Sequence, residues 1–362
     1  MKKTVCMVLA MLAGFCFSAD LFANEKDHQK KNYENEKFVW TDNYVSEGNH
    51  AALAPSTEEI VTTCLSKDGK PLRWVRKNDI YKYGKFTGTS TLETALYNMA
   101  VDEMINNFEK DGTLRTGLYW GGVWTRDVSY SSLLSLAYMC PDKVKNSLEV
   151  KIDRMGRIIQ DTGTGGSWPC SSDRVVWALS AWNIYLATGD IEWLQKAYPV
   201  IIKSLECDDM VVFNPQTGLY RGESSFIDWR EQSYPTWAQP ADIYLSECLG
   251  TNAAFYGVLK VTADMAAALG YKKDAKKYAQ KAEALKQAIN DRFWVEEDGY
   301  YASYWYGRQN QVRTQHSETL GESFCVLFGI ADEERAAKVI SSMHVGEFGP
   351  PIFSPQIVSQ GD

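Results

Sequence analysis

The feature that most constrains this chain is a series of apolar runs with helical spacing between residues 91 and 343. In each run, apolar side chains recur every three or four residues, which places them on one face of a helix. No repeated strand–helix alternation accompanies them, so the pattern favours antiparallel helix pairs around one core over a βαβ architecture. The spacing predicts nine helices, at about 92–105, 128–139, 144–159, 175–187, 191–205, 243–269, 275–293, 320–329 and 333–343.

Turn residues divide this helical region and predict two β inserts. Gly189 and Gly270 directly follow helical runs, as is typical of helix C-termini. Residues 210–222 carry Asn-Pro and Gly between short β-prone stretches, which indicates a hairpin, and residues 298–305 form an aromatic turn and strand. Residues 24–90 are polar and irregular, with short strand-like pieces such as 73–75. The expectation is therefore an all-α domain with short β inserts over 91–362, after an N-terminal segment at 24–90.

The first 23 residues have the three-part pattern of a secretory signal peptide. Lys2 and Lys3 provide a positive start, residues 4–19 are largely apolar, and small residues follow up to Ala23. The apolar run is short for a membrane span, and no later run is long enough to cross a bilayer. A lipid anchor on Cys16 is less favoured because Phe15 stands where a small residue is expected. Export to the periplasm or the medium is the expectation.

Charge and cysteine spacing exclude several classes of function. The formal net charge is −8, and the lysines at 272–277 lie among alanines on what reads as a solvated helix face. An acidic chain without a basic patch offers no footprint for nucleic acid. Six widely spaced cysteines follow the leader without any C-x-x-C pair, and no glycine-rich phosphate loop is present. We therefore expect neither a metal nor another cofactor, and mainly free buried thiols.

Aromatic residues make up 13% of the chain, with 12 Trp and 20 Tyr. Flat amphipathic rings fill cores, and they also line pockets that hold the apolar faces of sugars. Trp120 and Trp124 flank two glycines before the pair Arg126-Asp127 at a predicted helix start. The guanidinium fork of Arg126 can bind two neighbouring hydroxyls, and Asp127 can accept from the same ring. The alternative is structural: Asp127 at the helix dipole and Arg126 in a salt bridge.

A second cluster repeats the order of aromatic residue, turn, charged pair and helix. Trp168 precedes Pro169, and Asp173-Arg174 follows at the next helix start. Trp168, Asp173 and Arg174 are candidates for substrate binding. The competing interpretation is that Asp173 only caps its helix.

A third cluster places three carboxylates within nine positions after the predicted hairpin. They are Glu223, Asp228 and Glu231, with Trp229 among them. Glycoside hydrolysis needs a carboxylic acid to protonate the leaving oxygen, and an aromatic, poorly hydrated setting keeps such an acid protonated. Asp228, between Ile227 and Trp229, fits this role best, and Glu231 is its rival. An exposed loop with salt bridges is the structural alternative. A weaker cluster of His316, Glu318 and Glu322 reads as structural or surface groups.

At these motifs the chain resembles a known group of enzymes. Residues 124–127, Trp-Thr-Arg-Asp, resemble the glucoamylase motif, and related Arg-Asp pairs occur in debranching glucosidases and other six-hairpin glycosidases. Residues 223–228 resemble the loop of trehalases and processing glucosidases in which an Asp is the general acid. The resemblance covers roughly residues 90–350. It implies an (α/α)6 toroid in which Arg126 and Asp127 hold the cleaved sugar and Asp228 donates the proton.

The resemblance also implies an inverting, exo-acting hydrolase of α-linked oligosaccharides, glucosidase- or mannosidase-like. A second carboxylate would then activate water across the ring. In these families that base comes from the last hairpins, and here only Glu347 follows residue 343 as a poor candidate. Nine predicted helices stand where the toroid has twelve, so an incomplete C-terminal part is expected.

Three other classes compete with this interpretation. A non-catalytic carbohydrate-binding protein would keep affinity through Arg126, Asp127 and the tryptophans without turnover. A polysaccharide lyase on a related toroid is disfavoured because its chemistry uses Tyr or His bases beside cationic groups. A helical-repeat scaffold predicts a fixed repeat period, and none is present. The expected partner is an oligosaccharide or polysaccharide.

Overall fold

A computed structural model of the chain describes residues 32–35, 37–159, 168–225, 234, 237–346 and 349–355. The chain divides into two compact units, unit 1 (Met1–Phe108) and unit 2 (Glu109–Asp362). The division lies after Phe108 and not at residue 90 as predicted, because the helix that starts at residue 91 packs on the preceding strands. Each unit is described by itself.

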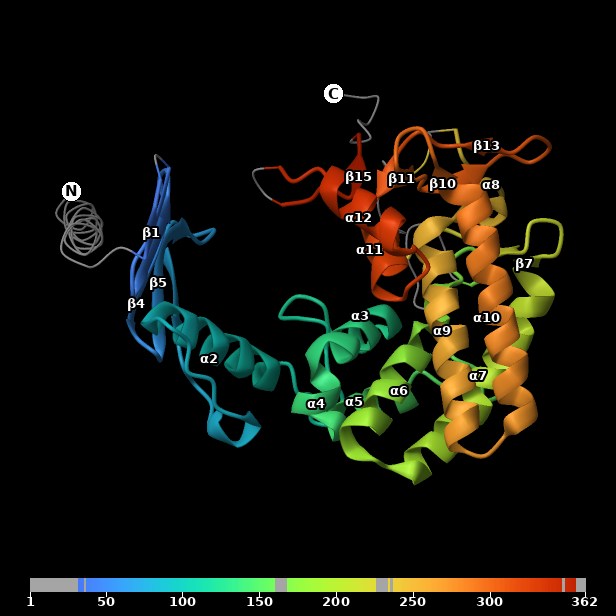
Figure 1. Cartoon of the computed structure of the whole chain (residues 1–362). Coiled ribbons are helices and arrows are strands. Elements are labelled where there is room, and N and C mark those ends of the chain that lie inside the picture. Colours follow the sequence, from blue (N-terminus) through green and yellow to red (C-terminus); the bar gives the residue numbers. More distant parts are fainter. Residues whose placement is uncertain are drawn as a thin grey trace, which may run out of the picture. The chain divides into compact units, whose positions relative to one another are not determined.

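Unit 1 is an antiparallel sheet covered by one helix (Figure 1). The helix α2 (Thr91–Asn106) packs against β4 and β5, where Ala54 and Ile60 of the sheet meet Leu92 and Ala95. It starts at Ser90, whose hydroxyl accepts from the Glu93 N–H while the Glu93 carboxylate accepts from the Ser90 N–H. The six strands pair in sequence order: β1 (Tyr33–Glu34), β2 (Phe38–Trp40), β3 (Tyr44–Glu47), β4 (His50–Ser56), β5 (Glu59–Leu65) and β6 (Pro71–Val75).

This regular sheet replaces the irregular segment that was predicted for residues 24–90. The periodicity is weak because the strands are short and much of their surface stays accessible; β6 contains no buried residue. A strand with two partly solvated faces lacks the apolar–polar alternation that identifies strands in a sequence.

Unit 2 is built mainly from helices, with short β inserts between them. Its helical elements are α3 (Thr125–Ser131), the π-helical turn η2 (Ser132–Leu136), α4 (Ala137–Met139), α5 (Pro141–Glu149), the 3-10 turn η3 (Asp173–Val176), α6 (Trp177–Thr188), α7 (Ile191–Val211), α8 (Pro240–Leu245), α9 (Leu249–Ala268), α10 (Lys272–Phe293), α11 (Thr319–Leu327) and α12 (Glu333–Ser342). The inserts are β7 (Phe213–Asn214) with β8 (Leu219–Tyr220), β10 (Trp294–Val295) with β11 (Tyr300–Tyr301), β9 (Glu247–Cys248) with β12 (Tyr304–Tyr306) and β13 (Val312–Arg313), and β14 (Ser317–Glu318) with β15 (Phe353–Ser354).

The helices of unit 2 form two layers. Helices close in the sequence pack as pairs, α3 with α5, α6 with α7, α9 with α10 and α11 with α12 (Figure 1). The first members of these pairs also contact one another along the series, α3 with α6, α6 with α9 and α9 with α11. They therefore form an inner layer, and their partners an outer one. Fifteen of the twenty residues of α9 are buried, which fits its inner position.

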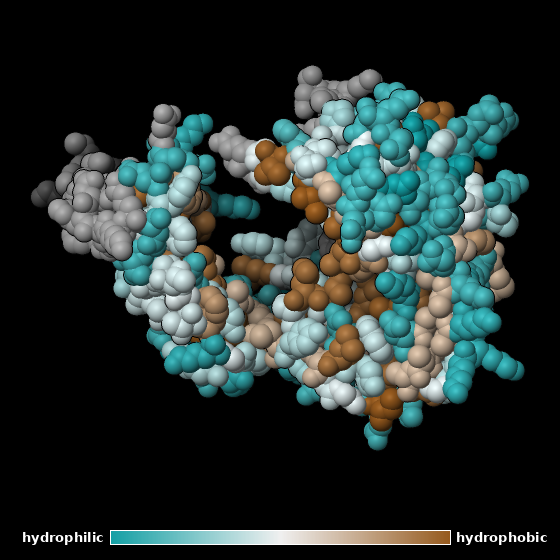
Figure 2. Space-filling model, in the orientation of Figure 1, coloured by the Kyte–Doolittle hydropathy of each residue, from teal (hydrophilic) through white to brown (hydrophobic). Residues whose placement is uncertain are grey.

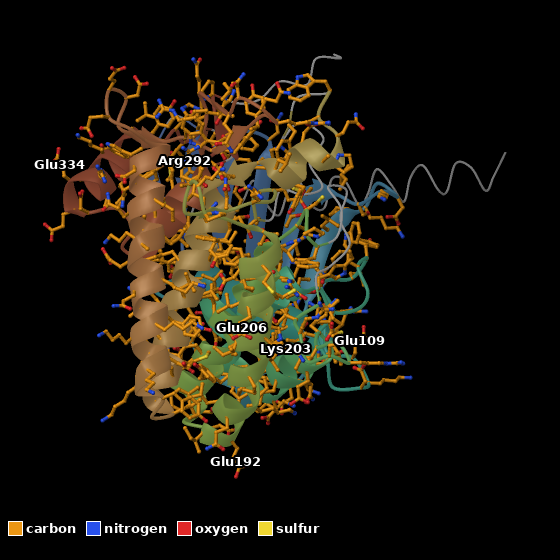
Figure 3. All side chains as sticks on the ribbon, turned by 90° about the vertical axis from the view of Figure 1, so that its right-hand side faces the viewer. Glu109, Glu192, Lys203, Glu206, Arg292 and Glu334 are labelled. Atoms are coloured by element: carbon orange, nitrogen blue, oxygen red, sulfur yellow. The ribbon has the colours of Figure 1, made fainter. Side chains whose placement is uncertain are left out.

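The outer layer presents charged side chains to solvent. Glu192, Lys203 and Glu206 project from α7 (Figure 3). In Figure 2, hydrophilic side chains cover α10, while hydrophobic ones gather over the region of α3 and α11. Exposed apolar residues of unit 2 include Leu134, Tyr138 and Leu327.

Two predicted helices are interrupted in the structure. The run at 144–159 ends at Glu149, and residues 150–159 form turns in which Ile152 and Ile158 make a β-bridge. The run at 243–269 consists of α8, the strand β9 and α9. Cys248 pairs with Tyr304 of β12, and such a distant pairing leaves no trace in local periodicity. The hairpin at 210–222 and the aromatic insert at 298–305 agree with the predictions.

No helix in the described parts of the chain is long and apolar enough to cross a membrane. The six cysteines from Cys64 to Cys325 are free thiols, and three of them, Cys140, Cys248 and Cys325, are buried.

Candidate active site

The predicted sugar-binding arginine lies at the buried start of α3. Trp124 is in extended conformation before the helix, and the Thr125 hydroxyl donates to the Ile159 carbonyl at 2.9 Å. Arg126 is only 4% exposed, and its Nη1 lies 3.5 Å from Asp173 Oδ1 and donates to Ser171 Oγ at 3.2 Å. Two segments that the sequence treated as separate clusters are thus joined by a buried ion pair, which fixes the guanidinium.

Asp173 connects this arginine to the segment after the β7–β8 hairpin. Ser225 Oγ donates to Asp173 Oδ2 at 2.5 Å, and the Tyr130 hydroxyl lies 2.6 Å from the same Ser225 Oγ. Because the Ser225 hydroxyl has one proton and directs it at Asp173, Tyr130 is the donor to Ser225. Burial raises the pKa of Tyr130, so this donor keeps its proton throughout the neutral range.

The neighbouring serine, Ser224, contacts the start of α11 in the α11–α12 pair. Ser224 Oγ donates to Glu318 Oε1 at 2.6 Å, and Glu318 lies at the start of α11. Gly250 of α9 permits this contact, since a Cβ there would collide with Glu318 Oε1 and with Ser224 Oγ. A Cβ at Gly321 of α11 would similarly collide with Leu249. Close approach of α9 and α11 at these glycines therefore carries Glu318 to the serine pair.

Glu318 and Glu322 are buried carboxyl groups in the same region. Glu318 Oε2 is buried and accepts no hydrogen bond from the described residues. Burial raises the pKa of Glu318 to about 7, and the nearby Glu322 carboxyl also acts to raise it. Burial raises the pKa of Glu322 to about 7 as well, although its Oε1 accepts from the Tyr301 N–H. Both carboxyl groups thus keep their proton up to a higher pH than an ordinary glutamate does.

Arg174 points away from Asp173 into a separate buried pair. Its Nη2 donates to Asp208 Oδ1 at 2.7 Å and its Nη1 to the Ile158 carbonyl at 2.6 Å. The guanidinium carbon lies 4.8 Å from the centre of the Trp168 ring, whose Nε1 also donates to Asp208. Burial raises the pKa of Asp208 to about 6 despite the arginine. This arrangement favours a structural role for Arg174 and Trp168, which the sequence had assigned to substrate binding.

The loop before α3 presents its aromatic residues to solvent. A turn at Gly117–Trp120 has backbone hydrogen bonds in both directions, and Trp120 is 65% exposed. Its ring meets that of Trp124 edge to face at 6.4 Å. Asp127 lies in the first turn of α3, where its charge is favourable to the helix dipole. A role of these residues in sugar binding stays a prediction from the sequence.

The predicted acid cannot be placed. Asp228, Trp229 and Glu231 lie outside the described residues, so their roles stay predictions from the sequence. Glu223 is described and only 2% exposed. Its N–H donates to the Cys170 carbonyl at 2.9 Å, and its own carbonyl accepts from the Thr251 hydroxyl at 2.5 Å. The segment that enters the acid loop is thus fixed on both sides by backbone contacts.

A further buried carboxylate, Glu247, lies beside this segment and is neutralised. It forms a β-bridge with Gly222, and its Oε1 accepts from Asn214 Nδ2 at 2.7 Å. Arg292 Nη2 lies 3.6 Å from its other oxygen, and Figure 3 shows Arg292 near the end of α10. Among the described residues, no group of three or more His, Cys, Asp or Glu side chains is arranged to hold a metal ion.

Sequence reasoning missed several residues of this network. Ser224 and Ser225 were noted only as part of the acid loop, and Tyr130 and Asp208 look like ordinary members of their helices. Glu318 was interpreted as a structural or surface group, and the structure shows it completely buried. The available signal was its place after a β insert at the start of an apolar helix, where a buried carboxylate needs a partner.

The paired helices of unit 2, with short β inserts between them, have the fold type of six-hairpin glycosidase domains. Residues 160–347 match the family described as the bacterial alpha-L-rhamnosidase 6 hairpin glycosidase domain. This match spans more than half of the chain, which therefore belongs to that family. No curated protein matches the chain.

Two solved structures show the same fold. The GH78 family rhamnosidase of Bacillus sp. GL1 superposes with a TM-score of 0.54 and 17% identity, over 75% of this chain and 28% of the rhamnosidase. The GH63 mannosylglycerate hydrolase of Thermus thermophilus, in complex with glucose, gives a TM-score of 0.53 and 14% identity, over 67% of this chain and 74% of the hydrolase. The chain thus spans little more than a quarter of the length of that rhamnosidase.

Proposed function

We propose that the chain is an exo-acting, inverting glycoside hydrolase that cleaves terminal α-linked sugars, with α-L-rhamnosides as the first substrate class to test. The family match supports the glycosidase class, and the rhamnosidase and mannosylglycerate hydrolase likenesses support 6-deoxymannose- or mannose-configured sugars. In this proposal Arg126 and Asp127 hold the terminal sugar, and Asp228 protonates the leaving oxygen.

One observation carries the proposal. A continuous set of buried polar contacts runs from Arg126 through Asp173 to Ser225, and the adjacent Ser224 bonds Glu318. The segment that leads into the predicted acid is therefore held against the predicted sugar-binding arginine by two different helix pairs. Fixing a binding group and the residues that lead into the acid loop on one frame favours positioning of a substrate against a general acid.

The test measures hydrolysis of p-nitrophenyl α-L-rhamnoside, α-D-mannoside and α-D-glucoside by the full chain. Asp228→Asn should lower kcat by about 10²–10⁴-fold with KM nearly unchanged, because general acid catalysis contributes that factor. Arg126→Ala should raise KM strongly. Arg154→Ala is the matched control, since Arg154 is an exposed arginine of the same unit. The anomer released first, followed by NMR, distinguishes inversion from retention.

Each alternative outcome has a definite reading. If Glu231→Gln abolishes turnover and Asp228→Asn does not, Glu231 is the acid. If no glycoside is cleaved but sugars bind in an Arg126-dependent way, the chain is a non-catalytic carbohydrate-binding protein. Turnover that survives all three substitutions would refute the proposed site.

We also propose that the protein is exported after removal of about the first 23 residues, because Lys2, Lys3 and the apolar run have the pattern of a signal peptide. N-terminal sequencing of the mature protein from the periplasmic fraction tests this. Lys2→Glu with Lys3→Glu should slow processing, and an unprocessed N-terminus in the native protein would contradict the proposal.

A further inference from the structure

Unit 1 contains a cavity that the proposed hydrolysis does not use. It has a volume of about 540 Å³, is widely open to solvent, and lies where the connection between β6 and α2 passes the turns of the sheet. This volume is within the range of about 300–1,000 Å³ that is usual for small-molecule sites. Its walls combine two aromatic rings, several hydroxyl side chains, one amide and two charged groups of opposite sign.

The aromatic rings of the cavity are held in place yet remain accessible. Tyr81 is 52% exposed; its hydroxyl donates to Glu58 Oε1 at 2.9 Å, and the Arg76 guanidinium lies over its ring. Phe86 is 44% exposed and packs against the Tyr97 ring at 5.2 Å. The Phe86 ring also lies close to the backbone at Gly88, where a Cβ would be 3.1 Å from it. Fixed, half-exposed rings of this kind suit the C–H face of a ligand.

The polar group that most clearly indicates a ligand is Asn98. It is only 7% exposed, and its Nδ2 donates to the Thr57 carbonyl at 2.8 Å. This bond orients the amide, and Asn98 lines the cavity. An oriented amide at the wall of a cavity can accept a hydrogen bond from a ligand hydroxyl through its oxygen.

The charges of the cavity select against ionic ligands. Asp42 already accepts from the Thr91 hydroxyl at 2.6 Å and from the Thr91 N–H at 3.3 Å. Lys85 is exposed and makes no ion pair with a described residue. One negative and one positive group cancel formally, so phosphates and acidic sugars gain no net attraction, while hydroxyls find both an acceptor and a donor.

We propose that this cavity is a second, non-catalytic binding site for one neutral sugar residue of a carbohydrate chain. The apolar face of the ring packs on Phe86, a hydroxyl donates to Asn98 Oδ1, and another accepts from Lys85 Nζ. Retention of a sugar on unit 1 is independent of any hydrolysis by unit 2, and it gives the protein a second point of attachment to a polymeric carbohydrate.

The test is ligand-observed NMR titration of the full chain with L-rhamnose, D-mannose, D-galactose and D-glucose. Arg126→Ala removes the proposed site of unit 2, so binding that persists in this variant reports the second site. In that background Phe86→Ala and Lys85→Ala should each weaken the affinity about tenfold, the effect of a lost stacking or charge-assisted contact. Tyr33→Ala is the matched control, because Tyr33 is a 53% exposed ring of the same unit that packs on Phe38 and does not line the cavity.

Three results would overturn the proposal: no saturable binding of any of the four sugars, loss of all binding on Arg126→Ala alone, or equal affinities of the Phe86, Lys85 and Tyr33 variants. Failure of the proposed hydrolysis is separately visible, since it removes turnover and leaves the binding that depends on Phe86 unchanged.

Discussion

Replacing Glu318 by Gln should flatten the pH dependence of the stability of this protein. Glu318 is completely buried, and one of its oxygens accepts from the Ser224 hydroxyl while the other accepts from no described residue. A carboxylate in that setting is unfavourable, so the folded protein retains the proton. Its pKa is raised from the ordinary 4.5 to about 7, mainly by burial.

The magnitude and the sign follow from this difference. Since the folded state binds the proton more tightly than the unfolded state, stability is fully present below pH 4.5 and is lost as the pH rises toward 7. A difference of about 2.5 pH units at about 1.36 kcal/mol each corresponds to about 3 kcal/mol. Most of this loss, about 2–3 kcal/mol, falls between about pH 5 and pH 8.

The assay is urea unfolding at pH 5, 6, 7 and 8, followed by tryptophan fluorescence. The wild type should lose stability across this range, and Glu318→Gln should lose about 2–3 kcal/mol less because glutamine does not titrate. A constant offset from altered hydrogen bonding to Ser224 does not affect this comparison of slopes. Glu283→Gln, which changes an exposed glutamate of α10, should leave the slope unchanged.

Parallel curves for the wild type and Glu318→Gln would show that Glu318 is ionised in the folded protein at pH 7. In that case the burial argument for this part of the site would be wrong. A smaller slope in Glu283→Gln as well would assign the effect to net charge and not to Glu318.

Three more substitutions probe the buried contacts of unit 2. Gly250→Ala should destabilise unit 2 and lower activity on the proposed substrates, because the added methyl collides with Glu318 and Ser224. Thermal unfolding measures this loss of stability. Gly270→Ala is the comparison for backbone strain alone, because its φ is positive and its Cβ site is open. Arg174→Met should cost about 3–5 kcal/mol by leaving Asp208 buried without its cation, and an additional Asp208→Asn should restore part of that loss in urea unfolding. Ser225→Ala should raise KM for p-nitrophenyl α-L-rhamnoside several-fold by releasing Asp173, while unaltered kinetics would separate Ser225 from substrate positioning.

Local sequence patterns predicted most helices and two of the β inserts of unit 2. The runs that begin near residues 175, 191, 275 and 333 correspond to α6, α7, α10 and α12, because an inner or outer helix buries one stripe at a 3.6-residue period. Gly189 ends α6 as the sequence indicated, and its backbone there is left-handed. Unit 1 was poorly predicted, since its partly solvated strands lack a clear alternation.

In the candidate site, too, local properties could be predicted from the sequence and tertiary contacts could not. The sequence by itself determined which residues are chemically able to bind a sugar, among them Arg126, Asp127 and Asp173, because residue type and helix position are local properties. Only the tertiary structure decided that Arg126 pairs with Asp173, whereas Arg174 turns to Asp208. Neighbours in the chain can point to opposite sides of one turn, and local patterns do not reveal which side faces a partner.

The role of Glu318 shows the limit most clearly. Its partner Ser224 lies 94 positions earlier in the chain, and the two meet only because α9 and α11 approach closely at Gly250 and Gly321. The sequence determined that a carboxyl group stands at the start of an apolar helix. The packing of two helices decided that this group is buried, protonated near neutral pH and bonded to the segment before the predicted acid, because burial and pKa depend on all surrounding elements at once.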